Sequence, residues 1–215
     1  MQTKVRGIQS VTGNEIDILA NEEGALAVAQ MASGYEEITR QGRAFIAKNT
    51  VAVASVIALP TTAISFALYN SAADGGRSII IDAVFAIGPA NAAAALEQVS
   101  MIYNLGQTRA ALPTNSAMVP LKTNGYGPGT DTVAYTTIGG TALDAVTGVA
   151  INWFPIGNSV TTAVVSLPGG ALWVPVDGRL ICPPGRYFAL HTLAASVGLT
   201  MNVGCMWHER VLTLV

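Results

Sequence analysis

Few residues in this chain have side chains suited to binding metals or acting as nucleophiles, and they do not form a recognised pattern. The candidate soft ligands are Cys182, Cys205, His191, His208 and Glu209. A zinc site needs local pairs of ligands such as Cys-x-x-Cys, and the sequence contains none. On an extended strand His208 and Cys205 fall on opposite faces, because successive side chains alternate. We therefore expect two buried thiols, two structural histidines, no metal and no cofactor.

The sequence also lacks the motifs that common enzymes use. It has no Gly-x-Ser-x-Gly elbow, phosphate-binding loop or dinucleotide fingerprint. Glu22 and Glu23, like Glu36 and Glu37, are sequential neighbours. On an extended chain such pairs point to opposite sides and do not face each other across a substrate cleft. We therefore expect a protein that is not an enzyme.

Charged residues are sparse. Lysine and arginine number 11, aspartate and glutamate number 13, and together they make up 11% of 215 residues, against about 25% in a typical soluble protein. A monomer of this size exposes roughly 9,000 Å², which leaves about 400 Å² of surface for each charge. We infer that much of the surface is hidden against other subunits, in an assembly component that forms a homo-oligomer.

The charge pattern also bears on nucleic-acid and membrane partners. The net charge is −2 and no basic cluster is present, so direct nucleic-acid binding is not expected. The uncharged segment Asn49–Ala73 has an apolar stretch of nearly membrane-spanning length. Pro60 interrupts it, however, and its Val, Ile, Thr and Phe residues favour two short strands over a membrane span. The first ten residues lack the apolar run of a signal peptide, which predicts synthesis and retention in a cytoplasm.

Residues 1–34 are predicted to form an extended N-terminal arm. Glu15–Leu19 alternates strictly between polar and apolar residues, which indicates a strand, and Ala25–Ala29 is a second short apolar piece. Neither is long enough to form a core, and such an arm typically pairs with an exposed sheet edge of its own chain or a neighbour's. We predict that the arm adds a strand to a neighbouring subunit through its apolar residues Val5, Ile8, Ile16, Ile18, Leu26 and Val28.

Residues 35–215 are predicted to form one all-β domain, a jelly-roll-like antiparallel β-sandwich. Strand signals recur at short spacing, turn residues separate many of them, and few amphipathic helices are visible. Asp177-Gly178 is a typical hairpin turn, Pro89–Gln98 could hold a helical turn or two, and residues 106–130 are expected to form a long loop. The predicted strands are Tyr35–Arg40, Ala44–Val53, Ala63–Asn70, Ser78–Gly88, Gln98–Leu105, Asp131–Ile138, Val149–Phe154, Val160–Ser166, Ala171–Val174, Leu180–Cys182, Tyr187–Thr192 and Leu199–Trp207.

Three of these strands have a readable burial pattern. Leu199–Trp207 and Gln98–Leu105 alternate, so each has one inner face. Ser78–Gly88 is apolar almost throughout, which predicts burial on both faces. The expected inner-face residues are Leu199, Met201, Val203, Cys205 and Trp207 in the first strand and Val99, Met101, Tyr103 and Leu105 in the second.

The aromatic anchors of the chain are Trp153, Phe154, Trp173 and Trp207, each inside an apolar stretch. Carbohydrate-binding modules expose such rings as platforms, but scattered tryptophans more often lie in a core or a subunit interface. We assign Trp153 and Phe154 to the subunit interface, together with the arm residues.

Several segments resemble jelly-roll structural proteins of tailed bacteriophages. Val174–Gly185, Tyr187–His191 and Val203–Glu209 look like the final strands of those proteins, and Glu37–Gly42 and Phe154–Ser159 are similar to further segments. The resemblance covers about residues 35–215 and rests on turns and strand ends.

The resemblance implies a virion component that is assembled in the host cytoplasm, most plausibly a capsid decoration or cement protein. Such proteins are commonly homotrimers that clamp neighbouring capsid subunits from outside, so the major capsid protein is the expected partner. The resemblance supplies no catalytic residues. Two alternatives stay open: a tail, baseplate or fibre protein, with or without glycan recognition, and an enzyme built on a sandwich, which would need a polar cleft.

Overall fold

The computed structural model describes residues 5–8, 15–18, 34–60, 64–70, 76–91, 97–108, 120–138, 152–161, 171–195 and 197–212. They fall into two compact units, Met1–Glu37 and Ile38–Val215. In the first unit β1 (Val5–Ile8) pairs antiparallel with β2 (Glu15–Ile18). This confirms the strand predicted at the alternating segment, whereas Ala25–Ala29 lies outside the described residues.

The segment Gly34–Arg40 is a helix, α1, so the strand predicted at Tyr35–Arg40 is wrong. Two glutamates stand in its first turn and an arginine in its last, an arrangement that the helix dipole favours. Gly42 has a φ of 69° and its backbone nitrogen donates to the carbonyl of Thr39 at 3.0 Å. This left-handed glycine ending stabilises a short helix that the pattern of apolar residues did not reveal.

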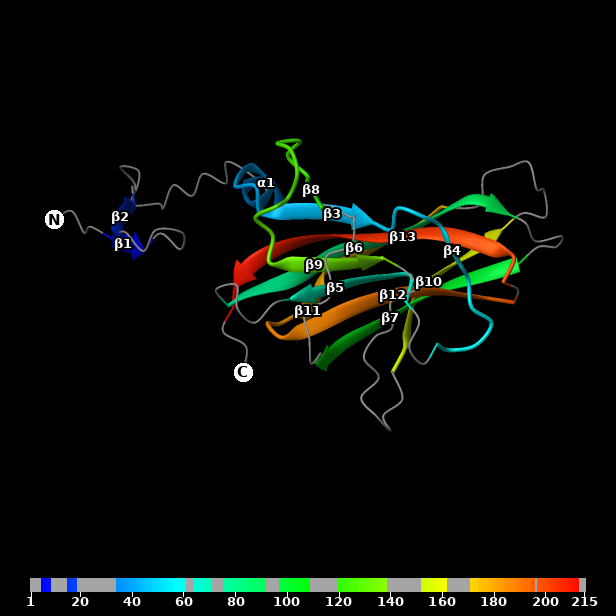
Figure 1. Cartoon of the computed structure of the whole chain (residues 1–215). Coiled ribbons are helices and arrows are strands. Elements are labelled where there is room, and N and C mark those ends of the chain that lie inside the picture. The colour runs from blue at the N-terminus through cyan, green and yellow to red at the C-terminus, as the bar shows by residue number, and fades with distance from the viewer. Residues whose placement is uncertain are drawn as a thin grey trace, which may run out of the picture. The chain divides into compact units, whose positions relative to one another are not determined.

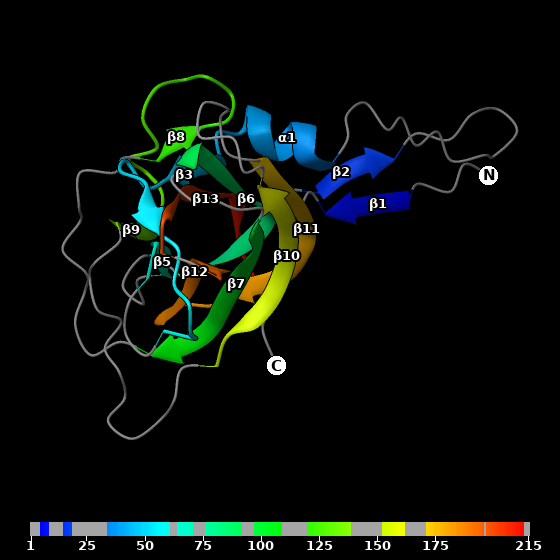
Figure 2. The same ribbon diagram turned by 90° about the vertical axis from the view of Figure 1, so that its right-hand side faces the viewer.

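The second unit consists of two antiparallel sheets (Figure 1). One sheet has the strand order β11-β6-β13-β3-β8, with β4 also paired to β13, and the other has the order β10-β7-β12-β5-β9. Seen along the strands, the sheets face each other as two layers (Figure 2). The strands are β3 (Ala44–Lys48), β4 (Val53–Ala54), β5 (Phe66–Asn70), β6 (Arg77–Asn91), β7 (Glu97–Thr108), β8 (Leu121–Lys122), β9 (Ala134–Ile138), β10 (Phe154–Thr161), β11 (Ala171–Cys182), β12 (Arg186–Ala194) and β13 (Leu199–Val211).

The order of strand pairing identifies a jelly roll. Strand β3 pairs with β13, β5 with β12, β6 with β11, and β7 with β10. Each pair is nested inside the previous one along the chain, and the two sheets share the members alternately, which is the winding of a jelly roll. The predicted fold class, a jelly-roll-like antiparallel sandwich, is confirmed.

The predicted hairpin at Asp177-Gly178 is wrong, because the chain does not reverse there. Both residues have positive φ, 52° and 74°, but they lie inside a single strand, β11. Pro175 pairs with Ala83 and Leu180 with Ile81, so four residues of β11 stand opposite one residue of β6. A turn-like pair of left-handed residues here makes a bulge, after which β11 resumes pairing with the same neighbour.

Three other expected boundaries also change. Strand β6 continues to Asn91, so the helical turn expected from Pro89 does not form there, and residues 92–96 lie outside the described part. The expected long loop 106–130 begins only after Thr108 and contains the short strand β8. Strand β10 runs from Phe154 to Thr161 and joins the ends of two separately predicted strands.

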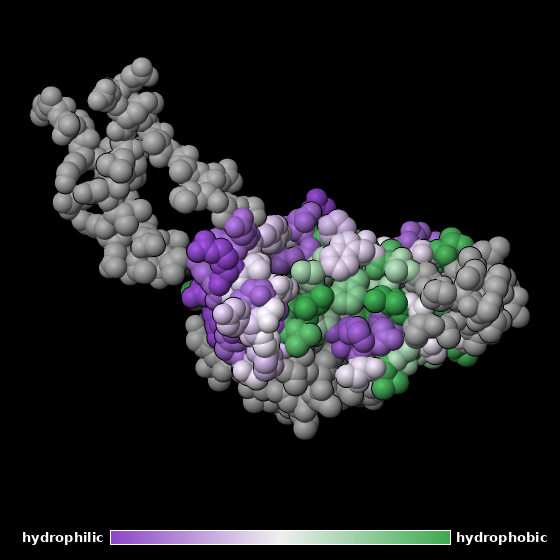
Figure 3. Space-filling view, turned by 90° about the horizontal axis from the view of Figure 1, so that it is seen from above, coloured by the Kyte–Doolittle hydropathy of each residue, from purple (hydrophilic) through white to green (hydrophobic). Residues whose placement is uncertain are grey.

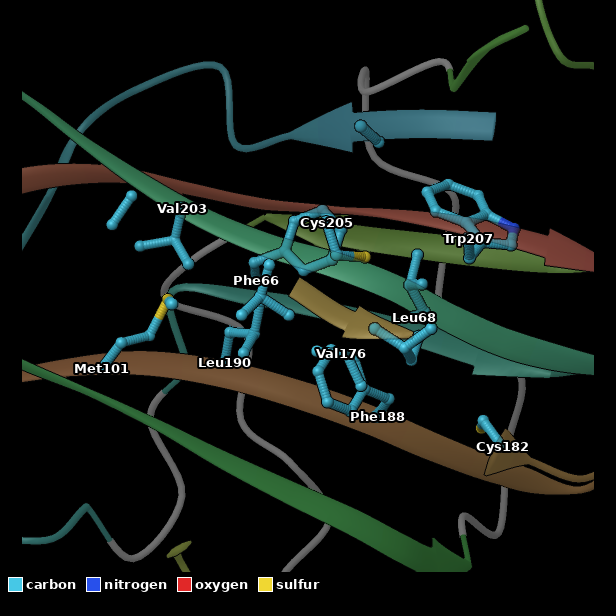
Figure 4. Close-up of a cluster of buried hydrophobic side chains, with 14 of the residues drawn as sticks. Phe66, Leu68, Met101, Val176, Cys182, Phe188, Leu190, Val203, Cys205 and Trp207 are labelled. Carbon is cyan, nitrogen blue, oxygen red and sulfur yellow. The ribbon is translucent and has the colours of Figure 1, made fainter. Parts of the chain in front are cut away.

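The main core lies between the sheets, and the predicted inner faces of β13 and β7 supply part of it. Side chains from both sheets point toward one another there (Figure 4). Trp207 is fully buried and stacks on Phe45 with ring centroids 5.7 Å apart. Strand β6 is buried from Ser78 through Ala86 except at Asp82, and Ile87 is exposed, so its predicted burial on both faces holds over most of its length.

A second apolar cluster covers the outer face of the five-stranded sheet. Its residues alternate along β5 and β12 with those of the main core. Trp153 closes this cluster and donates from Nε1 to the carbonyl of Pro60 at 2.8 Å. The cluster comprises Ile64, Ala67, Tyr69, Ile102, Trp153, Tyr187 and Ala189, with Leu193 packed against it.

Candidate functional site

Both cysteines are free and buried in the core, as their apolar surroundings predict. Burial raises the pKa of Cys182 to about 12, and burial raises the pKa of Cys205 well above its ordinary value. The Cys182 Sγ donates to the carbonyl of Arg186 at 3.2 Å. Since the thiolate is the reactive species, both side chains are held in their unreactive form.

His191 is buried on the outer side of the five-stranded sheet. Its Nδ1 lies 2.8 Å from the backbone nitrogen of Thr192, 3.1 Å from the carbonyl oxygen of the same residue and 3.2 Å from Ser65 Oγ. Burial lowers the pKa of His191, which keeps the ring neutral. Ser65 is itself fully buried. The pair resembles a nucleophile and base in distance, but the burial of both side chains makes it a structural hydrogen bond.

Asp82 and His208 contact each other on the outer face of the six-stranded sheet. His208 Nδ1 lies 2.8 Å and 3.0 Å from the two carboxylate oxygens of Asp82, and the two side chains are largely buried. Asp82 stands at a register shift between β6 and β13, directly opposite the bulge of β11. Asp82 is therefore the extra residue at the irregularity between β6 and β13, and its contact with His208 links these two strands there.

Glu209 is a buried carboxylate at the end of the sandwich where β13 ends. Its Oε1 accepts from Thr132 Oγ1, from the backbone nitrogen of Val133 at 3.0 Å and from Trp207 Nε1 at 3.5 Å. Its Oε2 lies 3.1 Å from Arg77 Nη1, an ion pair outside hydrogen-bond geometry. Burial raises the pKa of Glu209, and these four partners partly oppose the rise. The cluster ties β6, β13 and the segment before β9 together.

These polar residues do not converge on one site. Within the described ranges, no group of three or more His, Cys, Asp and Glu side chains is placed to hold a metal ion. Among the same residues, no helix is long and apolar enough to span a membrane.

The residues predicted for the subunit interface are divided between the two units of the chain: some lie in the first unit and others in the second. Val5 and Ile8 lie on β1, Ile16 and Ile18 lie on β2, and Leu26 and Val28 fall outside the described residues. Trp153 is only 8% exposed and belongs to the second cluster of this subunit, whereas Phe154 is 51% exposed and contacts Tyr103 at 5.8 Å between ring centroids.

A second exposed aromatic ring, that of Trp173, lies on the outer face of β11, beside β6. The Trp173 ring is 56% exposed and stacks on Phe85, with centroids 5.6 Å apart and planes 9° apart. Phe85 in turn lies over Gly204, where an added Cβ would stand 2.7 Å from the Phe85 ring. The exposed Trp173 ring is held flat against Phe85, so it loses little conformational entropy when a partner covers it.

Figure 3 shows the molecule from the side of the six-stranded sheet. Hydrophobic side chains gather over the middle of this face beside a small hydrophilic group, and most hydrophilic side chains lie toward the end where β3 begins. Alternation along β11 explains the outward position of Trp173. Leu172, Val174 and Val176 pack against the core, so the residues between them face out. That alternation is the signal in the sequence that distinguishes Trp173 from a core tryptophan.

Comparison with protein-family models, with curated proteins and with solved structures returned no match. The features of the chain that bear on its function are the jelly roll, the sparse charge and the exposed apolar side chains.

Proposed function

We propose that this protein is a virion structural protein, a capsid decoration or cement protein that self-associates and clamps neighbouring capsid subunits. The observation that carries the proposal is the exposed Trp173 ring, which stacks on the buried Phe85 ring on the outer face of a jelly roll. Exposed apolar surface beyond isolated residues marks contact sites in soluble proteins, and tryptophan is enriched at the energetic centres of such contacts.

The composition supports the same proposal. With 11% charged residues, the chain has little ionic surface to keep a monomer apart from its copies. The jelly roll is a common scaffold of viral capsid proteins, but also of lectins and enzymes, so the fold alone supports the proposal only by analogy. In this proposal the partners are copies of the chain, as a homotrimer, and the major capsid protein, and the location is the virion.

Co-expression with the major capsid protein encoded in the same genome tests this function. We expect the chain to co-sediment with the assembled shells and to form regular density on their outer surface in electron micrographs. The Trp173→Ser variant should lower occupancy at least about tenfold, because the centre of the contact is removed. Tyr126→Ser is the matched control, since Tyr126 is 85% exposed on the turn after β8 and should not change occupancy.

A folded-state check accompanies these variants, because the Trp173 ring also packs on Phe85. Trp173→Phe keeps a flat ring and should restore most of the occupancy. Shells that carry none of the wild-type chain would rule out a decoration role.

A tail, baseplate or fibre protein that binds a glycan is the second candidate. Its support is the same exposed Trp173 ring, because an aromatic face can stack on the apolar face of a sugar. Wild-type chain found on tails, together with a specific glycan-array signal that Trp173→Ser abolishes, would favour this candidate over decoration.

A further inference from the structure

One end of the jelly roll is aliphatic and carries little charge, and it is distinct from the aromatic surface on β11. At this end β6 and β10 terminate, β7 and β11 begin, and the β12–β13 turn is located, on the right in Figure 1. We call it the β12–β13 end, and Figure 2 looks onto it. Its exposed aliphatic side chains, 57–72% accessible, are Val51, Ile57, Leu59, Val160 and Val197.

Strand pairing brings these residues together from segments that are far apart in sequence. Val53 pairs with Met201 and Val56 bridges to Leu193, so residues 51–57 wrap the strands that flank the β12–β13 turn. Val160 pairs with Gln98 at the start of β7, one residue beyond the Val99–Ala194 pair that borders the same turn.

Charge is distributed unevenly between the two ends of the domain. Segments 49–60, 83–91, 154–161 and 193–199 carry no charged residue, and neither do the connections 61–63, 92–96 and 162–170 in the sequence. Glu97, the first residue of β7, pairs with Thr161 and is the charged residue at this end, and Lys48 ends β3. The opposite end holds the Arg77–Glu209 and Lys122–Asp131 pairs. The asymmetry follows from the jelly-roll winding, which places alternate connections at opposite ends.

We propose that the β12–β13 end is the surface through which copies of this chain associate with one another. A surface with a single carboxylate, that of Glu97, offers a charged partner little attraction or ion pairing to offset the partner's desolvation. The same end of a second copy has matching polarity, and symmetric closure would bring identical ends together. In the described ranges 49–60, 87–91, 158–161, 195 and 197–199, 17 residues are at least partly exposed, and they supply most of the roughly 20–30 residues that one side of a standard interface uses.

This inference deepens the self-association in the proposed function, since it names the surface and leaves the aromatic face of β11 and the charged end free for the shell. The mechanism is burial of aliphatic area, so the assembly should persist at 1 M salt, where exposed ion pairs are screened.

The test is the oligomeric state of the purified full chain, measured by light scattering and sedimentation over a range of concentrations. Ile57→Asp and Val197→Asp should each weaken association at least about tenfold, because symmetric contact buries the new carboxylate and brings like charges together. Val211→Asp is the matched control: it is the same change at a residue 71% exposed near the opposite end, and it should leave the assembly intact. Near-ultraviolet circular dichroism verifies that each variant is folded.

A wild-type chain that is monomeric at 0.1 mM would overturn the proposal, as would aspartate variants that associate normally or a control that dissociates equally. A flotation assay with neutral phosphatidylcholine vesicles tests the alternative partner. If the wild-type chain is monomeric and binds these vesicles, the partner of this end is a lipid surface and not a second copy of the chain. Shell binding is measured separately. A folded, monomeric Ile57→Asp variant that still binds shells would uphold this inference, and wild-type oligomers that ignore shells would refute only the decoration role.

Discussion

The Arg77–Glu209 pair predicts a stability loss that depends on pH. Glu209 has no exposed surface, whereas the Arg77 side chain is 31% exposed. Removing one partner of a fully buried ion pair costs about 3–5 kcal/mol. Partial exposure of Arg77 reduces this, so we expect Arg77→Met to lower the free energy of unfolding by about 2–3 kcal/mol at pH 7. For a chain of this size the loss corresponds to a fall of about 4–12 °C in the melting temperature.

The pH dependence follows from the direction of the pKa shift. Burial raises the pKa of Glu209 above its value in the unfolded chain, so its contribution to stability is fully present below the unfolded pKa, about 4.3, and is lost as pH rises through the folded pKa. The positive charge of Arg77 lowers the pKa of Glu209, so Arg77→Met should raise that pKa further. The variant should therefore lose more stability than the wild type at neutral pH. At pH 4 the carboxyl is mostly protonated, and the variant should approach the stability of the wild type.

Thermal and denaturant unfolding at pH 4 and pH 7 measures the effect. Lys122→Met is the matched control, because its partner Asp131 is 60% exposed and the pair should contribute less than about 1 kcal/mol. The reasoning fails if Arg77→Met is no more destabilising than Lys122→Met, or if its loss is the same at both pH values.

Three further predictions concern the interior. Gly204→Ala should lower the free energy of unfolding by about 1–3 kcal/mol or more, because the added Cβ would collide with the backbone oxygen of Ala47 on the neighbouring strand. Gly157→Ala should cost less, because its added Cβ would stand 2.6 Å from a side-chain atom, Val174 Cγ2. Urea unfolding compares the two variants. Cys182 and Cys205 should not react with a thiol reagent at pH 8 until denaturant is added, and absorbance of the released chromophore measures this; rapid labelling of the folded chain would contradict their burial. Burial lowers the pKa of His191, so the stability that its neutral ring contributes is present above the unfolded pKa of about 6.5 and is lost as pH falls. The melting temperature of His191→Gln should therefore depend less on pH between 5 and 7 than that of the wild type.

The sequence predicted the fold class and the core because both depend on local periodicity. Alternation in Leu199–Trp207 and Gln98–Leu105 predicted the correct inner-face residues, because successive side chains of a strand point to opposite faces of the sheet. Recurrent short strands with turn residues predicted the sandwich. The sparse charge, on which the expectation of association rests, is a property of composition and needs no structure.

The tertiary structure decided which partner each segment meets, because pairing between distant strands is not encoded in local pattern. It made Asp177-Gly178 a bulge, since β6 continues beside β11 on both sides of it. It buried Trp153 under the Pro60 carbonyl and left Trp173 exposed, although both are tryptophans in apolar stretches. It also gathered the uncharged segments at one end of the domain, because the nested winding of a jelly roll sends alternate connections to opposite ends.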